Sequence, residues 1–94
     1  MPDARSVYWT IHAERRLQER PELSREMVEA AVRAPDACFR AVTHANRWIA
    51  HQAVQVAGKP YLLRVFYDME PGGVAVVVSC YVTSDVERYG RLEP

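Results

Sequence analysis

Four residues between positions 47 and 81 have side chains suited to phosphoryl chemistry: His51, Arg64, Arg47 and Tyr81. An imidazole with a pKa of about 6.5 transfers protons at neutral pH, and a guanidinium matches the oxygens of a phosphate group. Cleavage of RNA through its own 2′-hydroxyl needs a base, a cation at the phosphorus oxygens and an acid for the leaving 5′-oxygen. We therefore expect a histidine such as His51 as base, Arg64 with Arg47 on the phosphate, and Tyr81 as acid or stacking group.

The charge of the chain is unevenly distributed. The 94 residues include 12 Lys+Arg and 12 Asp+Glu, so that the formal net charge is zero. Residues 37–67 contain four basic residues, two histidines and no acid, which makes this segment locally cationic. A neutral chain gains little affinity for RNA from counterion release outside this segment. The total charge therefore favours a non-catalytic protein-binding module, whereas the cationic segment favours a nuclease, and both remain open.

Two amphipathic helices are predicted before the strands that carry these residues. The first covers Ile11 to Arg20, with Thr10 as its N-cap and Pro21 directly after it. The second begins after Ser24 and ends before Pro35, and apolar residues recur along one of its sides. Together they form a helical hairpin with one apolar face.

Four strand-like runs follow the helices and are separated by turn signals. They cover residues 38–44, 47–56, 61–67 and 74–83. Short loops between consecutive runs indicate an antiparallel meander that needs a cover on one face. The predicted fold class is therefore α+β, a single domain in which an N-terminal helical hairpin packs on a four-stranded antiparallel sheet.

The predicted hairpin loops determine which side chains share a face of the sheet. A two-residue loop at Gly58-Lys59 and a four-residue loop at 69–72 place Arg64 opposite Val77 and diagonal to Ser79. The face away from the helices is then expected to carry Arg47, His51, Arg64, Phe66, Ser79, Tyr81 and Thr83. Aromatic rings on such a face are suited to stacking on unpaired RNA bases. An ordinary solvated sheet surface with a few arginines would show the same residue types, and this alternative remains open.

The segment before the strands resembles the start of a known domain family. It reads T-I-H-A at 10–13, R-L at 16–17, E-R at 19–20, L-S at 23–24, A-V at 31–32 and P-D at 35–36. This is similar to the H-A-x-x-R-hydrophobic-x-x-R pattern of small bacterial domains related to the BrnT toxins. Leu63-Arg64-Val65 and Val78-Ser79-Cys80-Tyr81 resemble the family's two final strands, although Thr more often stands at the place of Ser79. The resemblance covers most of residues 7–85.

Such domains are grouped with the RelE and barnase-like metal-independent ribonucleases. The resemblance therefore implies a RelE/barnase-like fold, a toxin-like endoribonuclease with RNA as substrate, and a cognate antitoxin protein as partner. It draws attention to His12, Arg16 and Arg20 beside Arg64, Ser79 and Tyr81. His12 is a second candidate for the catalytic histidine, and Arg16 and Arg20 are candidates for phosphate contacts over the sheet edge.

Each of these helical residues also has a purely structural interpretation. His12, at the second position of the first helix, would equally well hydrogen-bond a neighbouring segment and hold the helix on the sheet. Arg16 and Arg20 lie four residues apart with acids nearby, which is typical of surface ion pairs that contribute little to stability. The sequence does not choose between these roles.

No cofactor and no metal ion are expected, because the histidines and cysteines show no short-spaced ligand pair. Cys38 and Cys80 lie in apolar stretches and are predicted to be buried thiols. No run reaches the length of a membrane span, and the first residues lack the layout of a signal peptide. We therefore expect a cytoplasmic protein that does not bind membranes, and a homodimer is compatible with these expectations.

Overall fold

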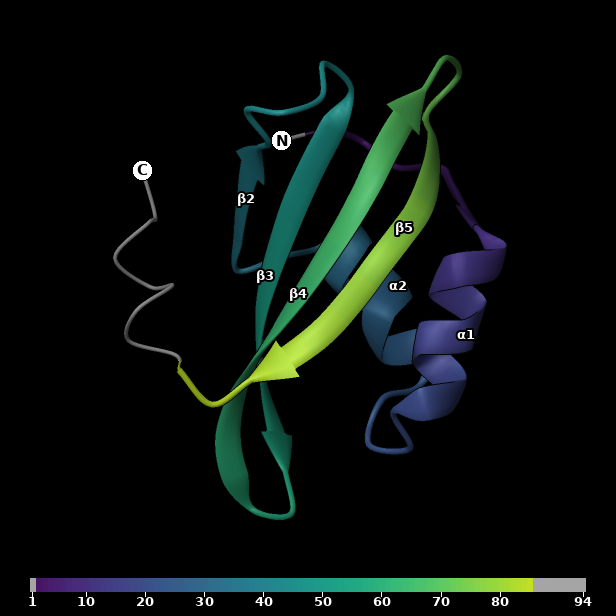
Figure 1. Ribbon diagram of the computed structural model, residues 1–94. Coiled ribbons are helices and arrows are strands. Elements are labelled where there is room, and N and C mark those ends of the chain that lie inside the picture. The colour runs from purple at the N-terminus through teal and green to yellow at the C-terminus, as the bar shows by residue number, and fades with distance from the viewer. Residues whose placement is uncertain (1, 86–94) are drawn as a thin grey trace.

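The computed structural model describes residues 2–85. Its elements are β1 (Ser6–Trp9), α1 (Ile11–Glu19), α2 (Arg25–Arg33), β2 (Ala37–Arg40), β3 (Arg47–Val56), β4 (Lys59–Glu70) and β5 (Val74–Thr83). The strands form one sheet in the order β1-β5-β4-β3-β2. In Figure 1, α2 lies behind the sheet and α1 lies beside β5 at the right, and residues of both helices pack into the same core. The mixed α+β class is confirmed, but the sheet has five strands instead of the predicted four.

The additional strand is β1, which precedes the helices and pairs with β5 in parallel. The predicted all-antiparallel sheet is therefore wrong at this edge, and the helices are not the first elements of the chain. Four residues are too few for a clear alternating pattern, and this segment is recognisable as a strand only from its pairing with β5. Val7 and Trp9 pack towards the helices, whereas the Tyr8 side chain between them is 61% exposed. Pairing with β1 satisfies the hydrogen-bonding groups along the outer edge of β5.

The two helices begin where their capping residues predict. The Thr10 hydroxyl accepts a hydrogen bond from the Ala13 amide at 3.1 Å, and the Ser24 hydroxyl accepts one from the Met27 amide at 3.1 Å. Each cap satisfies a backbone donor that the first turn of a helix leaves without a partner. α1 packs on β5 and α2 on β3 and β4, so that the whole helical layer covers one face. No helix among residues 2–85 is long and apolar enough to cross a membrane.

The first strand after the helices is shorter than predicted. β2 ends at Arg40, and residues 41–46 form a connection to β3 where a strand to His44 was expected. The Arg40 guanidinium donates a 2.6 Å hydrogen bond to the Ala45 carbonyl, and the Arg47 amide donates one of 3.2 Å to the His44 carbonyl. These bonds close the connection on itself. Residues 41–43 line the same pocket as Ile49 and Arg64 of the open face, so that the connection lies beside that face.

The β3–β4 hairpin turns at Ala57-Gly58, one residue earlier than predicted. Both residues have positive φ, 53° and 77°, which is the geometry of a type I′ turn. Glycine at the second central position is typical of this turn, and the sequence therefore contained the signal for the observed register. Val56 pairs with Lys59, and every opposed pair shifts by two residues relative to the prediction. A shift of two preserves the faces but places His51 directly opposite Arg64.

Ala57 is strained in this turn, because the left-handed region costs a residue with a β-carbon roughly 1–2 kcal/mol and Asn tolerates it better. Ala57→Asn is therefore expected to stabilise the fold by about 0.5–1 kcal/mol, or several degrees in Tm. Thermal unfolding followed by circular dichroism measures this. Ala53→Asn, an exposed position within β3, is the matched control and should give no gain. An Ala57→Asn variant that melts at or below the parent temperature would show that this turn is not strained.

The β4–β5 hairpin also differs from its predicted register. Glu70 pairs with Val74 across a turn at 71–73, and the register shifts between Phe66 and Tyr67, where Val78 is the additional residue of a β-bulge. Arg64 consequently lies opposite Tyr81, not Val77 as predicted. The bulge reverses the alternation of β5, because it places Ala75 and Val77 on the same face as Cys80. The faces predicted for β5 are correct for residues 79–83, after the bulge, and wrong for residues 74–77, before it.

The core lies between the helices and the inner face of the sheet. Its fully buried members include Val28 and Val32 of α2 and Leu63, Val65 and Tyr67 of β4. The Tyr67 hydroxyl and the Cys38 Sγ are 3.4 Å apart, so that the buried phenol has a polar partner, and burial raises its pKa. Trp48 packs against this core. Cys80 is buried and Cys38 is half-buried, and both are free thiols.

Candidate functional site

Three of the predicted catalytic residues lie in one row across the open face of the sheet. His51 on β3 is paired with Arg64 on β4, and Arg64 is paired with Tyr81 on β5. The hairpin register and the β-bulge together produce this row. The helices cover the opposite face of the sheet (Figure 1). The row lies on the face away from them, since its strand neighbours Ala50, Leu63 and Cys80 belong to the core.

Arg64 connects the other two members of the row. Its Nε donates a 3.0 Å hydrogen bond to Nε2 of His51, and an Nη atom donates to the Tyr81 hydroxyl. The guanidinium carbon lies 5.2 Å from the Phe66 ring centroid and 5.5 Å from that of Tyr81, within the range of cation–π contacts. These contacts hold the guanidinium plane in one orientation. A fixed planar donor group is what recognition of a phosphate or carboxylate requires.

His51 is a buried and neutral histidine. Its side chain is 1% exposed and packs edge-on against Phe39, with ring centroids 4.8 Å apart. Burial, and then the charge of Arg64, lower the pKa of His51 to about 4. Because Nε2 accepts the Arg64 hydrogen bond, the single proton of the neutral ring lies on Nδ1. The lone pair expected to act as base is thus directed at Arg64, and this geometry makes His51 a residue that orients the guanidinium.

A second row, next to the first, is apolar. Phe39 on β2, Ile49 on β3 and Phe66 on β4 are successive partners across the sheet. Phe66 also stacks on Tyr81, with centroids 6.1 Å apart and an interplanar angle of 20°. The aromatic rings of this face therefore adjoin the guanidinium of the first row. Such a surface is suited to a flat, partly apolar ligand that carries a negative charge.

The third row contains the other predicted phosphate-binding arginine. Arg47 donates two hydrogen bonds to the carboxylate of Asp68, its partner across β3 and β4, at 2.8 and 3.0 Å. The hydrogen bonds from Arg47 hold the pKa of Asp68 below its usual value, and they raise that of Arg47. Asp68 directly follows the segment that contains no acid. The local positive charge of this face is therefore smaller than the sequence distribution indicated.

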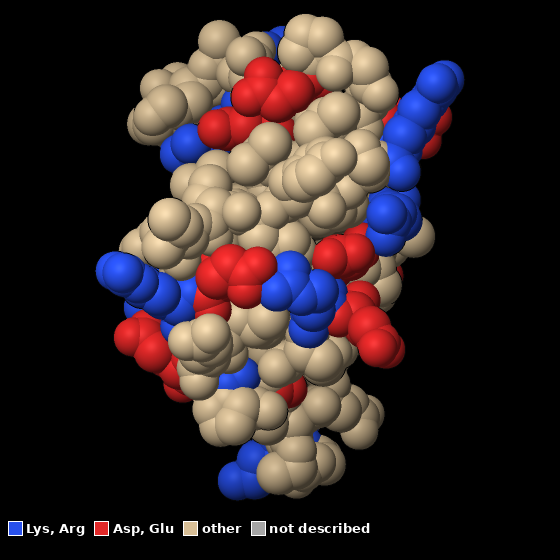
Figure 2. Space-filling model, turned by 90° about the vertical axis from the view of Figure 1, so that its right-hand side faces the viewer, with Lys and Arg blue, Asp and Glu red and all other residues tan. Residues whose placement is uncertain are grey.

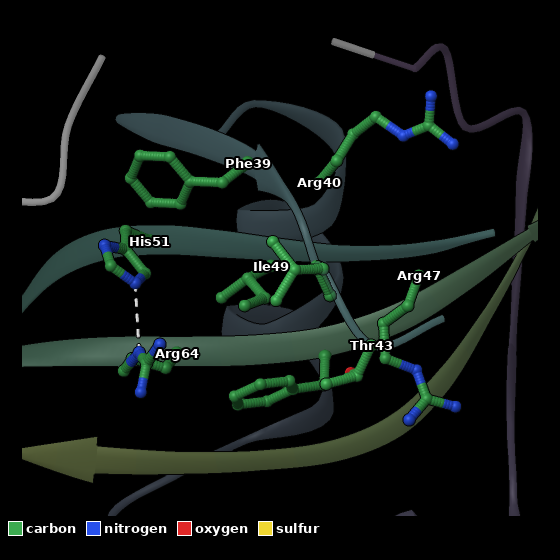
Figure 3. Close-up of a pocket in the computed structure, with 10 residues that line it drawn as sticks. Phe39, Arg40, Thr43, Arg47, Ile49, His51 and Arg64 are labelled. Carbon is green, nitrogen blue, oxygen red and sulfur yellow. Dashed lines mark hydrogen bonds between the residues drawn. The ribbon is translucent and has the colours of Figure 1, made fainter. Parts of the chain in front are cut away.

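Residues of all three rows line a pocket of about 640 Å³. In Figure 3, His51 and Arg64 lie at one end, Ile49 in the middle and Arg47 at the other end, with Phe39 above them. The pocket is lined by Phe39, Arg40, Ala41, Val42, Thr43, Arg47, Ile49, His51, Arg64 and Phe66. The connection between β2 and β3 supplies three of these residues. The volume of the pocket falls within the range of roughly 300–1,000 Å³ that is usual for small-molecule sites.

The remaining predicted members of the open face lie on β5. Ser79 is half-buried and paired with Phe66, next to the apolar row. Thr83 is paired with Leu62, and its hydroxyl accepts a 3.1 Å hydrogen bond from the Asp85 amide. Ser79 therefore adjoins the site, whereas the Thr83 hydroxyl binds a backbone amide just after the end of β5.

The helical candidates lie outside this site, in the layer that covers the other face. His12 is exposed near the start of α1. Arg16 and Arg20 are half-buried and lie close enough to the core-facing Cys80 for their charges to oppose the rise that burial produces in its pKa. Figure 2 shows that basic and acidic side chains alternate on the side where α1 lies and do not form a continuous basic surface. The structure thus does not bring His12, Arg16 or Arg20 to Arg64.

Several residues in the pocket or beside it were not identified as site residues from the sequence. Phe39 belongs to a four-residue edge strand, and Val42, which is fully exposed, belongs to a connection that the sequence presented as strand. Asp68 would have been found opposite Arg47 if the turn had been placed at Ala57-Gly58. Glycine at the second turn position was the available signal for Asp68, and no local signal identified Phe39 or Val42.

Within residues 2–85, no three His, Cys, Asp or Glu side chains are grouped so that they could hold a metal ion. The site is thus built from guanidinium, imidazole, phenol and apolar groups. Comparison with models of protein families, with curated protein sequences and with solved structures finds no match to this chain.

Proposed function

We propose that this protein is a metal-independent endoribonuclease-like toxin that cleaves single-stranded RNA through attack of a 2′-hydroxyl on the adjacent phosphate. The observation that carries the proposal is the Arg64 guanidinium, held between His51 and Tyr81 beside an aromatic pocket on the open face. In keeping with the resemblance to BrnT-like domains, its partners are RNA and a cognate antitoxin protein.

The roles of the side chains follow from their contacts. Arg64 binds the non-bridging oxygens and stabilises the charge that gathers on them as the 2′-oxygen bonds to phosphorus. Tyr81 donates its hydroxyl proton to the 5′-oxygen as the bond from phosphorus to that oxygen breaks. The proton of the 2′-hydroxyl passes to solvent, because the Nε2 lone pair of His51 is engaged by Arg64. The products are a 2′,3′-cyclic phosphate and a 5′-hydroxyl end.

A non-catalytic module that binds a protein through the same face is the second candidate. It is favoured by the Arg47–Asp68 ion pair and the neutral His51, which leave this face with less positive charge than RNA-clamping nucleases usually present. In that case Arg64 pairs with a carboxylate of the partner, since a guanidinium matches a carboxylate as well as a phosphate.

Incubation of the purified chain with an end-labelled single-stranded RNA in EDTA separates the two candidates. The proposal predicts cleavage products that end in a cyclic phosphate, and no cleavage at a position where a 2′-deoxynucleotide replaces the ribonucleotide. It also predicts that expression arrests growth and that a small antitoxin-like protein encoded beside the gene relieves the arrest. Intact RNA together with harmless expression would leave only the protein-binding module.

A further inference from the structure

The pocket beside Arg64 is larger and more apolar than a phosphate alone requires. Its apolar lining residues are Phe39, Ile49 and Phe66 of the sheet and Ala41 and Val42 of the β2–β3 connection, of which Val42 is fully exposed. Its basic lining residues are Arg40, Arg47 and Arg64, and His51 is neutral. Arg47 is paired with Asp68 at one end of the pocket, whereas Arg64 at the other end contacts the Phe66 ring (Figure 3). The ligand that fits this lining has a flat apolar part and an anionic part at one end.

The spacing of the rows relates the two parts of such a ligand. Arg64 and Phe66 lie two residues apart on β4 and project to the same face, which places their rows about 7 Å apart. A nucleobase and its phosphate are separated by one sugar over a comparable length. The Phe66 ring and the guanidinium are also in contact, with 5.2 Å from centroid to guanidinium carbon, so that both ends of one nucleotide would be bound together.

We infer that this pocket binds one ribonucleotide, with its base over Phe39, Ile49 and Phe66 and its phosphate at Arg64. The inference rests on the proposed function for the identity of the ligand as RNA. It adds that RNA is held through a base inserted into a pocket next to the cleaved phosphate, and not through the backbone alone. Cleavage therefore requires an unpaired nucleotide at that position.

Titration of the ¹⁵N-labelled protein with adenosine 3′-monophosphate tests the pocket without any cleavage step. Saturable amide shifts are expected at residues 39, 49, 64 and 66, and adenosine without a phosphate should bind at least tenfold more weakly. Adenosine 5′-monophosphate shows which side of the phosphate the bound base occupies, because the 3′-monophosphate binds more tightly if the base precedes it. Shifts confined to other strands, or equal binding of adenosine, would overturn the inference.

Filling the pocket gives the matching variant. Ile49 is half-buried on the open face, and Ile49→Trp should weaken binding of the 3′-monophosphate at least tenfold. Gln55→Trp, which adds the same side chain at an exposed β3 position outside the pocket lining, should bind within twofold of the parent. Ile49→Gln gives a second measurement if the tryptophan variant does not fold, and it should weaken binding several-fold. Parent affinity in a folded Ile49 variant would overturn the inference.

The two proposals fail separately in these experiments. If the protein binds the mononucleotide in the pocket but leaves RNA intact, the nucleotide site is supported and the nuclease proposal is contradicted. If the parent cleaves RNA and the Ile49→Trp variant cleaves it at the same rate, the nuclease proposal is supported and the nucleotide site is contradicted.

Discussion

Replacing Arg64 by lysine is expected to reduce RNA cleavage by about 10²–10³-fold while the protein remains folded. Arg64 donates to His51 and Tyr81 through different nitrogen atoms, and a single ammonium group cannot reproduce this planar arrangement. Loss of one preorganised donor at a developing negative charge usually costs this much in rate. Single-turnover cleavage of the labelled RNA in EDTA measures the effect, and circular dichroism confirms the fold.

Arg15→Lys is the matched control for this variant. Arg15 is an exposed residue of α1, in the layer on the other side of the sheet, so that the same chemical change should leave the cleavage rate within twofold of the parent. Expression of the Arg64→Lys variant should also no longer arrest growth. Cleavage by Arg64→Lys at a rate within threefold of the parent would remove Arg64 from the site, and with it the proposed mechanism.

The composition of the open face could be predicted from the sequence because face assignment depends only on parity. The predicted β3–β4 register was wrong by two residues, yet Arg47, His51, Arg64 and Phe66 still share a face. In the β4–β5 hairpin the faces agree only beyond Val78. A β-bulge inserts one residue and reverses the alternation, and an unbroken run of valines contains no mark of where this happens.

The contacts within the site could not be predicted, because they depend on which residues face each other and not only on parity. The predicted registers placed Arg64 opposite neither His51 nor Tyr81, whereas the structure places it opposite both. The pocket likewise depends on β2 and its connection, which come from a separate part of the chain. Only the packed structure shows that Asp68 neutralises Arg47.

Burial also changes what a histidine on this face can do. An exposed imidazole would be partly protonated at neutral pH and would repel Arg64, whereas a buried neutral ring accepts a hydrogen bond from it. The environment of His51 thus favours the form that orients the guanidinium and disfavours the form that would add a second positive charge. Burial and Arg64 thus raise the free energy of the protonated form of His51 in the folded protein. Lowering the pH should therefore destabilise the fold.

The free energy of unfolding is expected to fall by about 2–3 kcal/mol between pH 7 and pH 4 because of His51 alone. Its pKa is about 4 in the folded protein and about 6.5 when unfolded, so that the unfolded state binds more protons between these values and stability rises with pH across that window. Urea unfolding at successive pH values measures this dependence.

The variant His51→Gln isolates the contribution of the imidazole. Its amide oxygen still accepts a hydrogen bond from Arg64, but it does not titrate, and the slope of stability between pH 4.5 and pH 6.5 should become nearly flat. Asp68, whose pKa lies below its usual value, destabilises the protein only at lower pH, because the unfolded carboxyl titrates at about 3.9. Titration of the His51 ring by NMR provides the direct measurement. A midpoint near 6.5, or an unchanged slope in His51→Gln, would show that the ring is solvated and that burial and Arg64 do not lower its pKa.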